Sequence, residues 1–498
     1  MKYQPQFIIN NDVRHSTLII TKVNEVYMKI ESEAVIRQEL NDFFSFAVPG
    51  AKFMPAYKSR MWDGKIRLFD SMTKQLYLGL LPYVEHFANE REYTVEAAEE
   101  ISINENYSLD EGKKFIDKLQ LKLTPRDYQI DSFVHCIRNN RSLIVSPTAS
   151  GKSLIIYLLV QYYQKKTLLI VPTISLVHQM RSDFIDYGMH EDDIHMVMGG
   201  EEKTSDAPII ISTWQSIYKM RKDYFAQFSI VIGDECHLFK AKSLTSIMTK
   251  LVDCKYRFGF TGTLDGTETN KLVLEGLFGK AKQFVKTKEL IDANHLSAFK
   301  IKCLVLKHKD EEKKLVSKMN YQDEIDYIVS HERRNVFIKN LTVSLDGNTL
   351  LLFQYVDKHG RILYEKISKT VDKKYHNRKV FFVYGGTDAQ TREQIRAITE
   401  EETNAIIVAS YGTFSTGINI RNLHNIIFAS PTKSRIRNLQ SIGRGLRKGD
   451  SKNQALLFDI SDDLRHKAKI NYTLNHFSER VKIYNSEEFE YKIYNINL

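Results

Sequence analysis

The sequence predicts an α/β protein in which two doubly wound domains, each built on a parallel sheet, follow a small α+β N-terminal domain. The main observation is that short, wholly apolar runs alternate with helical patterns in two separate series. Such runs are typical of parallel strands, because helices cover both faces of the sheet. The first series comprises residues 142–145, 167–171, 209–212, 230–232 and 257–260, and the second comprises residues 349–353, 379–383, 405–409, 425–429 and 455–458.

The length of the chain supports a division into several domains. At 498 residues it is too long for one compact domain. We expect an N-terminal domain at 1–110, a first α/β lobe at 111–290 and a second at 291–465, followed by a short helical C-terminal extension at 466–498. The charged segment 280–345, between the two series, is expected to be largely helical in its second half.

Composition indicates an ordinary globular protein with a polyanionic partner. The chain is 43% hydrophobic and 27% charged, and 71 Lys+Arg against 61 Asp+Glu give a net charge of +10. The four cysteines form no C-x-x-C pair, which favours a reducing compartment. The start resembles no signal peptide, and no apolar run is long enough to span a bilayer. We therefore expect a cytoplasmic protein without a membrane partner.

Basic and aromatic residues are interleaved between positions 52 and 67 of the N-terminal domain. Cations can neutralise phosphates while rings stack on exposed bases, so this mixture suits unpaired or distorted nucleic acid. We expect Lys58, Arg60 and Lys65 to bind nucleic acid. The alternative is a small β-hairpin turning at residues 62–64, with its aromatics in the core and its cations solvated. The mixture comprises Lys52, Phe53, Tyr57, Lys58, Arg60, Trp62, Lys65 and Arg67, with Asp63 as the single acid.

A candidate phosphate-binding loop follows the predicted strand 142–145 and opens an apolar helix. Backbone amides of such a loop can cradle phosphates, Lys152 would neutralise the β/γ oxygens of ATP, and Ser153 would bind Mg²⁺. Taken alone, the Gly-Lys-Ser triplet fits a surface turn equally well, and Ser146 stands where the simplest consensus has glycine. The expected ATP-binding loop comprises Ser146, Pro147, Thr148, Ala149, Ser150, Gly151, Lys152 and Ser153.

Two adjacent carboxylates end the predicted strand 230–232. Asp234 can hold the Mg²⁺ that accompanies ATP, and Glu235 can orient and deprotonate the attacking water. A solvated acidic turn is the alternative. The phosphate loop lies 82 residues upstream (234 minus 152), and the pair together favour an ATP-hydrolysing site.

The run Asp-Glu-Cys-His at 234–237 resembles the DExH box of superfamily-2 helicases, and the other motifs of that family follow in order over residues 120–465. The resemblance implies RecA-like lobes, with Arg126 and Gln129 in a motif that reads adenine. It also implies a nucleic-acid track of Pro172, Thr173, Gln179, Thr213 and Gln215, and a set of residues coupling hydrolysis to lobe movement: His237, Thr261, Thr263 and Gln440.

In the second lobe the same resemblance covers two further motifs. It implies that Thr416 binds nucleic acid and that Gly417 and Asn419 bind ATP, although a helix cap is the plainer interpretation of 416–417. Arg444 and Arg447 match the arginine pair of the last motif, which stabilises charge on the transferred phosphate. Alone, this pair could be a solvated basic helix.

Stretches outside the universal motifs, at 41–46, 62–68 and 409–417, resemble the UvsW-like recombination and repair DNA helicases of phages. The resemblance implies an ATP-dependent helicase or translocase on branched DNA, which migrates Holliday junctions, regresses forks and removes R-loops. Its expected partners are four-way junctions, forks and RNA–DNA hybrids, with single-strand-binding or recombination proteins. The motor subunit of a restriction system, an RNA helicase and a clamp that binds ATP without turnover remain the alternatives.

Overall fold

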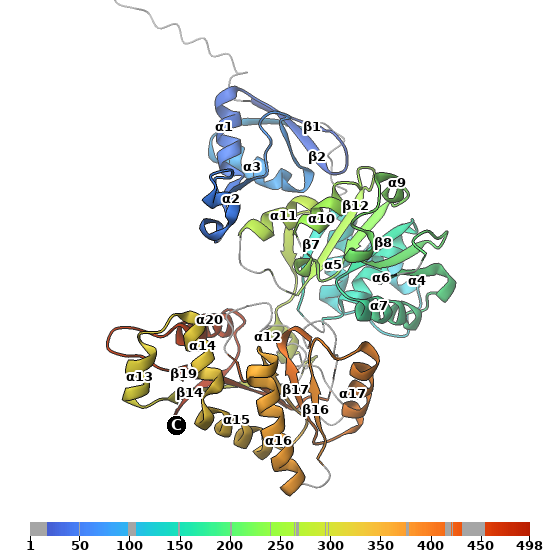
Figure 1. Cartoon of the computed structure of the whole chain (residues 1–498). Helices are drawn as coiled ribbons and strands as arrows, with labels where there is room; N and C mark the ends of the chain where they lie inside the picture. Colours follow the sequence, from blue (N-terminus) through green and yellow to red (C-terminus); the bar gives the residue numbers. More distant parts are fainter. Residues whose placement is uncertain are drawn as a thin grey trace, which may run out of the picture. The chain divides into compact units, whose positions relative to one another are not determined.

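The computed structural model divides the chain into two compact units, residues 1–145 with 153–282 and residues 146–152 with 283–498 (Figure 1). It describes residues 17–48, 50–97, 106–147, 150–199, 202–239, 241–262, 264, 268–293, 295–296, 298–374, 378–413, 420, 422–430 and 454–498.

The N-terminal domain is a mixed four-stranded sheet with helices, in the strand order β5-β2-β1-β6. Strand β1 runs antiparallel to β2 and parallel to β6. Leu18 and Ile20, two positions apart on β1, are both buried, as expected for a strand with one face on a core. This confirms the predicted α+β domain. Its main elements are β1 (Thr17–Lys22), β2 (Tyr27–Glu31), α1 (Ala34–Phe43), β5 (Gln75–Tyr77), α3 (Leu81–Glu90) and β6 (Thr94–Ala97).

A second, two-stranded sheet extends from this domain. Strand β3 (Ser45–Ala47) pairs antiparallel with β4 (Lys65–Arg67), and the helix α2 (Pro55–Lys58) lies between them in the chain. The hairpin alternative is therefore wrong about the connection: residues 62–64 enter β4 after a helix, and the two strands are not joined by a tight turn.

The first unit also contains a sheet of seven strands among its described residues, in the order β13-β7-β12-β11-β8-β10-β9. The neighbours from β7 through β9 pair in parallel, and every predicted strand of the first series is present. The strands are β7 (Arg141–Val145), β8 (Thr167–Val171), β9 (Ile194–Val197), β10 (Ile209–Thr213), β11 (Ile230–Gly233), β12 (Tyr256–Thr261) and β13 (Ala281–Gln283). The helices are α4 (Leu109–Lys118), α5 (Asp127–Asn139), α6 (Lys152–Tyr163), α7 (Ile174–Asp186), α8 (Trp214–Ile217), α9 (Lys222–Phe225), α10 (Ala241–Met248) and α11 (Glu268–Phe278).

Specific contacts join the N-terminal domain to this sheet within the first unit. The Tyr83 hydroxyl donates to Glu275 Oε2 at 2.7 Å, and Arg141 pairs with Glu25 at 3.1 Å. Gly79 lies so close to α11 that a Cβ there would meet the Glu275 carbonyl oxygen at 2.2 Å. Because this contact is with backbone, only glycine fits without a shift of the chain.

The second unit is built on a wholly parallel sheet of seven strands among its described residues, in the order β16-β17-β15-β18-β19-β14-β20. The second predicted series is confirmed in β15 (Thr349–Phe353), β16 (Val380–Val383), β17 (Ile406–Ser410), β18 (Asn425–Phe428) and β19 (Gln454–Asp463). The helices are α12 (Thr287–Asp292), α13 (Asp310–Val316), α14 (Tyr321–Ser330), α15 (Glu332–Ser344), α16 (Arg361–Lys374) and α17 (Ala389–Glu401).

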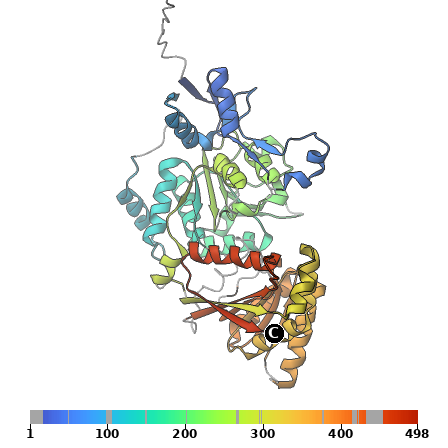
Figure 2. The same cartoon turned by 90° about the vertical axis from the view of Figure 1, so that its left-hand side faces the viewer.

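The C-terminal residues belong to this second sheet. The predicted helical extension is present as α20 (Tyr472–Ser486), but the chain then forms a strand, β20 (Tyr491–Asn497), that the sequence did not predict. Strand β20 pairs in parallel with β14 (Ala298–Lys307), beside which it lies in Figure 2. Residues 466–498 therefore complete the second lobe and are not a separate appendage.

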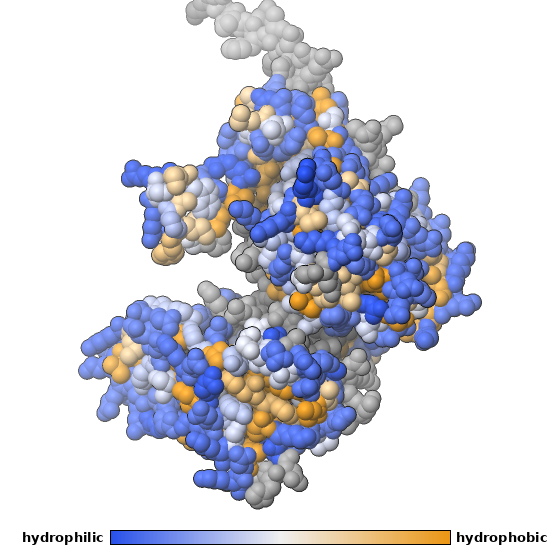
Figure 3. Space-filling model, turned by 45° about the vertical axis from the view of Figure 1, so that its right-hand side comes forward, coloured by the Kyte–Doolittle hydropathy of each residue, from blue (hydrophilic) through white to orange (hydrophobic). Residues whose placement is uncertain are grey.

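On the face shown in Figure 3, hydrophobic side chains appear in small groups among hydrophilic ones. Within the described residues, no helix combines the length and apolar character needed to cross a membrane.

Candidate active site

Three predicted catalytic residues, Lys152, Asp234 and Glu235, follow strands whose carboxyl ends meet at one edge of the first sheet. Val145, the last residue of β7, pairs with Thr261 of β12, and Gly233 of β11 pairs with Gly259 of the same strand. The segments that leave β7, β11 and β12 therefore start side by side. Ligands of open parallel sheets bind at such carboxyl ends.

The phosphate loop is held by its own hydroxyl groups. The Ser146 and Ser150 hydroxyls lie 2.6 Å apart, and Ser150 Oγ donates to the Pro147 carbonyl at 2.7 Å. Gly151 has φ of +79°, a left-handed conformation that favours glycine. Serine at 146, where the consensus has glycine, thus contributes a contact that stabilises the loop.

Lys152 begins α6, and its ammonium group donates to the Ser146 carbonyl at 3.3 Å. The Ser153 hydroxyl lies 2.9 Å from the hydroxyl of Tyr187. Burial raises the pKa of Tyr187, so its phenol stays protonated near neutral pH. Tyr187 is a positioning residue that the sequence did not reveal, because it lies 34 positions from its partner.

Asp234 and Glu235 leave β11 in the predicted place. The Asp234 side chain is buried, and its Oδ1 accepts the Glu235 backbone amide at 2.9 Å. Glu235 has a left-handed backbone, with φ of +48°. Non-glycine residues adopt this conformation rarely, and it concentrates at functional sites. Asp234 and the Ser153 hydroxyl offer oxygen atoms of the kind that Mg²⁺ prefers, and their role as its ligands stays a prediction.

A hydrogen-bonded network joins Glu235 to the end of β12. The Glu235 carboxylate lies 3.5 Å from His237 Nδ1 and accepts the Gly262 backbone amide at 3.4 Å. His237 Nδ1 in turn lies 2.5 Å from the Thr261 hydroxyl. The structure thus brings together the predicted catalytic base and two of the predicted coupling residues. Gly262 was not singled out as a contact from the sequence, because its backbone supplies the bond.

The predicted adenine-reading residues lie at the start of α5. Gln129 is buried, and its Oε1 accepts the backbone amide of Arg126 at 2.8 Å, while Arg126 Nη1 donates to the Tyr128 hydroxyl at 2.8 Å. Gln129 therefore caps its own helix through its amide oxygen. Its role as a reader of adenine stays a prediction.

The predicted nucleic-acid track occupies the ends of β8 and β10, which pair in parallel. Gln215 is exposed, and its amide donates to the Pro172 carbonyl at 3.4 Å, so two separate motifs meet. Thr173 caps α7, on which Gln179 is exposed. Thr213 Oγ1 bonds the Ser216 hydroxyl at 2.9 Å.

The N-terminal patch presents its cations to solvent. Lys58, Arg60 and Lys65 are exposed, and Phe53, which the hairpin alternative buries, is 81% exposed. Trp62 is half-buried, and its indole donates to the Lys65 carbonyl at 2.7 Å. The Phe53 ring is therefore available to a ligand, whereas the Trp62 ring takes part in the hydrogen bonding of the domain itself.

Nine of the predicted site residues lie outside the described residues, and their roles stay predictions. They are Thr148, Ala149, Thr263, Thr416, Gly417, Asn419, Gln440, Arg444 and Arg447.

Three sequence families match successive parts of the chain. The family described as DNA helicase UvsW, N-terminal, matches residues 21–98. The family described as type III restriction enzyme, res subunit, matches residues 122–266, and the helicase conserved C-terminal domain matches residues 332–449. The restriction-type match is thus confined to the first α/β lobe.

Two curated helicases or translocases match the chain, one of them over nearly its whole length. The ATP-dependent DNA helicase uvsW of Enterobacteria phage T4 is 34% identical over 499 residues, which cover 95% of this chain and 98% of the relative. The DNA 3'-5' translocase XPB2 of Sulfurisphaera tokodaii is 26% identical over 380 residues, 69% of this chain and 82% of its own. The crystal structure of T4 UvsW covers 97% of this chain and 99% of its own, at 32% identity and a TM-score of 0.52.

Proposed function

The chain belongs to the UvsW family of ATP-dependent DNA helicases, and from this membership we propose that it uses ATP and Mg²⁺ to move along and remodel branched DNA. The observation that carries the proposal is the extent of the similarity, 34% identity over 95% of the chain, with the N-terminal domain included. Similarity confined to the two lobes would support only an ATP-driven motor, without indicating its substrate.

The residues at the carboxyl edge of the first sheet fit an ATPase. When bound, ATP with Mg²⁺ supplies the phosphate that is transferred to water. Lys152 neutralises the phosphate oxygens, while Ser153 and Asp234 hold the metal. Glu235 orients the attacking water and accepts its proton. Arg444 and Arg447 stabilise the charge that develops on the transferred phosphate.

The network from Glu235 through His237 to Thr261 gives hydrolysis a physical path to the rest of the lobe. A shift of the Glu235 carboxylate after phosphate release changes its contact with the Gly262 amide and with His237. Gly262 directly follows β12, and His237 contacts Thr261, the last residue of that strand. We propose that this movement alters the grip of the track residues on DNA, so that each hydrolysis event advances the strand.

The expected nucleic-acid partners are forks, four-way junctions and R-loops, the last containing RNA–DNA hybrids. The N-terminal patch is the proposed contact with the duplex or branch point, while the track residues hold one strand. Single-strand-binding or recombination proteins are the protein partners that such substrates would bring. An RNA helicase is the alternative, because phosphate tracking alone does not select the sugar.

The deciding experiment compares nucleic acids as activators and substrates of the purified protein. We expect DNA to stimulate ATP hydrolysis more than RNA of the same sequence does. A synthetic four-way junction should be separated faster than a linear duplex with the same arms, and only with ATP and Mg²⁺. The Glu235→Gln variant is the control for turnover. Stronger stimulation by RNA, or equal rates on junction and duplex, would refute the proposal.

A further inference from the structure

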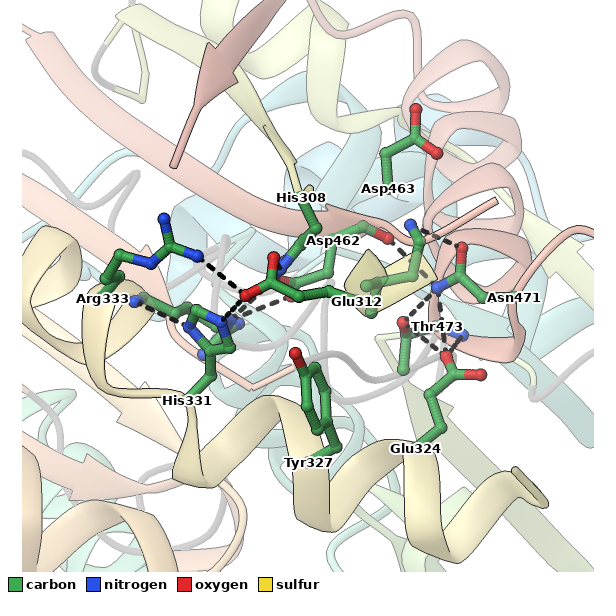
Figure 4. A network of polar contacts seen from close by, with 12 residues as sticks. His308, Glu312, Glu324, Tyr327, His331, Arg333, Asp462, Asp463, Asn471 and Thr473 are labelled. Atoms are coloured by element: carbon green, nitrogen blue, oxygen red, sulfur yellow. Dashed lines mark hydrogen bonds and ion pairs between the residues drawn. The ribbon is translucent and has the colours of Figure 1, made fainter. Parts of the chain in front are cut away.

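Two histidines and a glutamate of the second unit face one another, and none of the three is among the residues predicted for the ATP site. His308 directly follows β14, Glu312 lies on α13, and His331 is the N-cap residue of α15 (Figure 4). The His308 side chain is fully buried, and those of His331 and Glu312 are 8% and 18% exposed. Three different elements therefore bring these side chains to one place.

The three side chains present ligand atoms at metal-binding spacing. His308 Nδ1 lies 3.6 Å from Glu312 Oε2, and His331 Nε2 lies 3.0 Å from Glu312 Oε1. One ligand atom from each residue can be chosen so that all lie within 4.8 Å of one another. Ligands about 2.0–2.2 Å from a tetrahedral ion are themselves roughly 3.3–3.6 Å apart, so small side-chain shifts suffice.

A buried carboxylate sets the orientation of His308. Its Nε2 bonds Asp462 Oδ1 at 2.9 Å, and Asp462 also accepts Arg334 Nε at 2.9 Å. The buried Arg334 guanidinium thus holds Asp462 where it offers an acceptor to His308 Nε2. A neutral His308 that donates from Nε2 to this carboxylate turns the Nδ1 lone pair toward Glu312.

His308 Nδ1 is also a buried atom that makes no hydrogen bond among the described residues. A buried nitrogen with an unused lone pair is unfavourable unless something binds there. A carboxylate behind one imidazole nitrogen and a free lone pair on the other is the arrangement found around metal-binding histidines.

We propose that His308 Nδ1, Glu312 and His331 Nε2 form a Zn²⁺ site. Two imidazoles and one carboxylate suit zinc, whereas Mg²⁺ and Ca²⁺ take oxygen ligands. A fourth position is left for water on the side where Glu312 and His331 are partly exposed. The ion would join the end of β14 to the first turns of α13 and α15, and so fasten two helices to the sheet.

Arg333 competes with the proposed ion for Glu312. Its guanidinium lies 2.8 Å from Glu312 Oε1, and the side chain is 44% exposed, so it can swing away. The Lys309 backbone amide also donates to Glu312 Oε2, at 2.9 Å. This bond keeps the carboxylate in place on α13 when Arg333 leaves.

Binding changes both ring contacts of His331. Without the ion, Nε2 bonds Glu312 Oε1 at 3.0 Å, and Nδ1 accepts the Arg334 backbone amide at 3.3 Å and so caps α15. Coordination through Nε2 moves the ring proton to Nδ1, so both hydrogen bonds are exchanged for bonds to the ion.

The test uses the full-length protein, stripped of metal with a chelator, and Co²⁺ as a spectroscopic probe. Excess Mg²⁺ is present throughout to occupy the carboxylates of the ATP site, and neither nucleotide nor DNA is added. We expect one equivalent of Co²⁺ to bind with the strong visible absorption of a tetrahedral site. Zn²⁺ should displace it and raise the Tm of the protein.

Variants separate a metal site from a hydrogen-bonded network. Glu312→Gln and His308→Ala should abolish Co²⁺ absorption, while His190→Ala, which changes an exposed histidine of the first unit, should not. Arg333→Ala should tighten binding about tenfold, because it removes a charged competitor for Glu312. If the three residues served only as a hydrogen-bonded network, the Arg333→Ala variant would bind no metal.

Absence of stoichiometric binding in both the unaltered protein and Arg333→Ala would overturn the proposal, as would binding that survives Glu312→Gln. Because no DNA or ATP is present, either result leaves the helicase proposal untouched.

Discussion

One carboxylate from each of the two large sheets shows two contrasting environments. Glu235, which leaves β11, has a side chain 16% exposed, with an imidazole and a backbone amide as neighbours. Asp459 on β19 is fully buried, where it pairs with Arg480 at 2.7 Å and accepts the Tyr484 hydroxyl at 2.8 Å. An acidic side chain thus stays open to solvent just after a strand of the first sheet and is enclosed within a strand of the second. We propose turnover as the role of the first and assembly as the role of the second.

Asp459 differs from Glu235 in being paired with a buried arginine. Burial alone would lower the pKa of Arg480, but the Asp459 carboxylate outweighs it and raises that pKa, so the guanidinium stays charged inside the protein. A buried ion pair whose hydrogen bonds are satisfied fixes where its elements lie. The Glu235 carboxylate, which solvent still reaches, keeps the capacity to bind water.

The sharpest test of the contrast is Glu235→Gln. The change keeps the shape of the side chain but removes the base, so kcat for ATP should fall about 1,000-fold. ATP binding and the midpoint of urea unfolding should stay close to those of the unaltered protein. Steady-state ATPase rates and nucleotide binding measured by calorimetry would check this. Full activity would remove Glu235 from the catalytic role.

Asp459→Ala should lower the stability of the protein. Removing one partner of a buried pair leaves Arg480 uncompensated, which destabilises a protein by about 3–5 kcal/mol. We expect urea unfolding, followed by circular dichroism, to begin at a lower concentration. A double variant, Asp459→Leu with Arg480→Met, should recover much of the loss. Unchanged unfolding in the single variant would contradict the assembly role.

Thr261→Val tests whether the network beside Glu235 transmits movement. Valine keeps the shape of threonine but loses the hydroxyl that bonds His237. We expect DNA-stimulated ATPase to fall only a few-fold, and strand separation to fall about tenfold, a loss near 1.4 kcal/mol. Ser216→Ala, which removes a hydroxyl beside the track residue Thr213, is the comparison. Equal losses in both assays would mean that Thr261 supports the site without coupling it.

The smallest expected effect is in the N-terminal patch. Changing Lys58, Arg60 and Lys65 together to Ala should weaken four-way-junction binding several-fold, because each lost phosphate contact also reduces counterion release. The slope of log K against log salt should flatten by up to about 3, and basal ATPase should not change. Fluorescence anisotropy over a salt series measures both. An unchanged slope would show that these cations are only solvated.

Sequence patterns predicted the buried strands well because those strands are uniform. Every run of the two apolar series is a strand in the structure, whereas β14 was missed. In β14, Lys300 and Lys302 alternate with Ile301 and Cys303, and the pattern of a half-exposed strand is harder to separate from loop. β20 was missed for a related reason, because its Tyr, Lys and Asn residues resemble an irregular tail.

Within the site, residue types were predictable but their contacts were not. The DExH run identified Glu235 and His237, yet only the structure shows that Thr261 and the Gly262 amide reach them. Tyr187 beside Ser153 has no sequence signal at all. The cluster of His308, Glu312 and His331 is equally silent, because β14, α13 and α15 must fold before its members meet.

The close approach of Gly79 to α11 has a genetic consequence. Any side chain at this position collides with the carbonyl oxygens of Glu275 and Gly276. The N-terminal domain must therefore shift relative to α11. A Gly79→Ala allele would leave the ATP chemistry intact and disturb only where the patch points. A genetic screen could select conditional alleles whose products hydrolyse ATP normally but fail on junctions. We expect such a screen to find changes at Gly79 and at the residues that contact it.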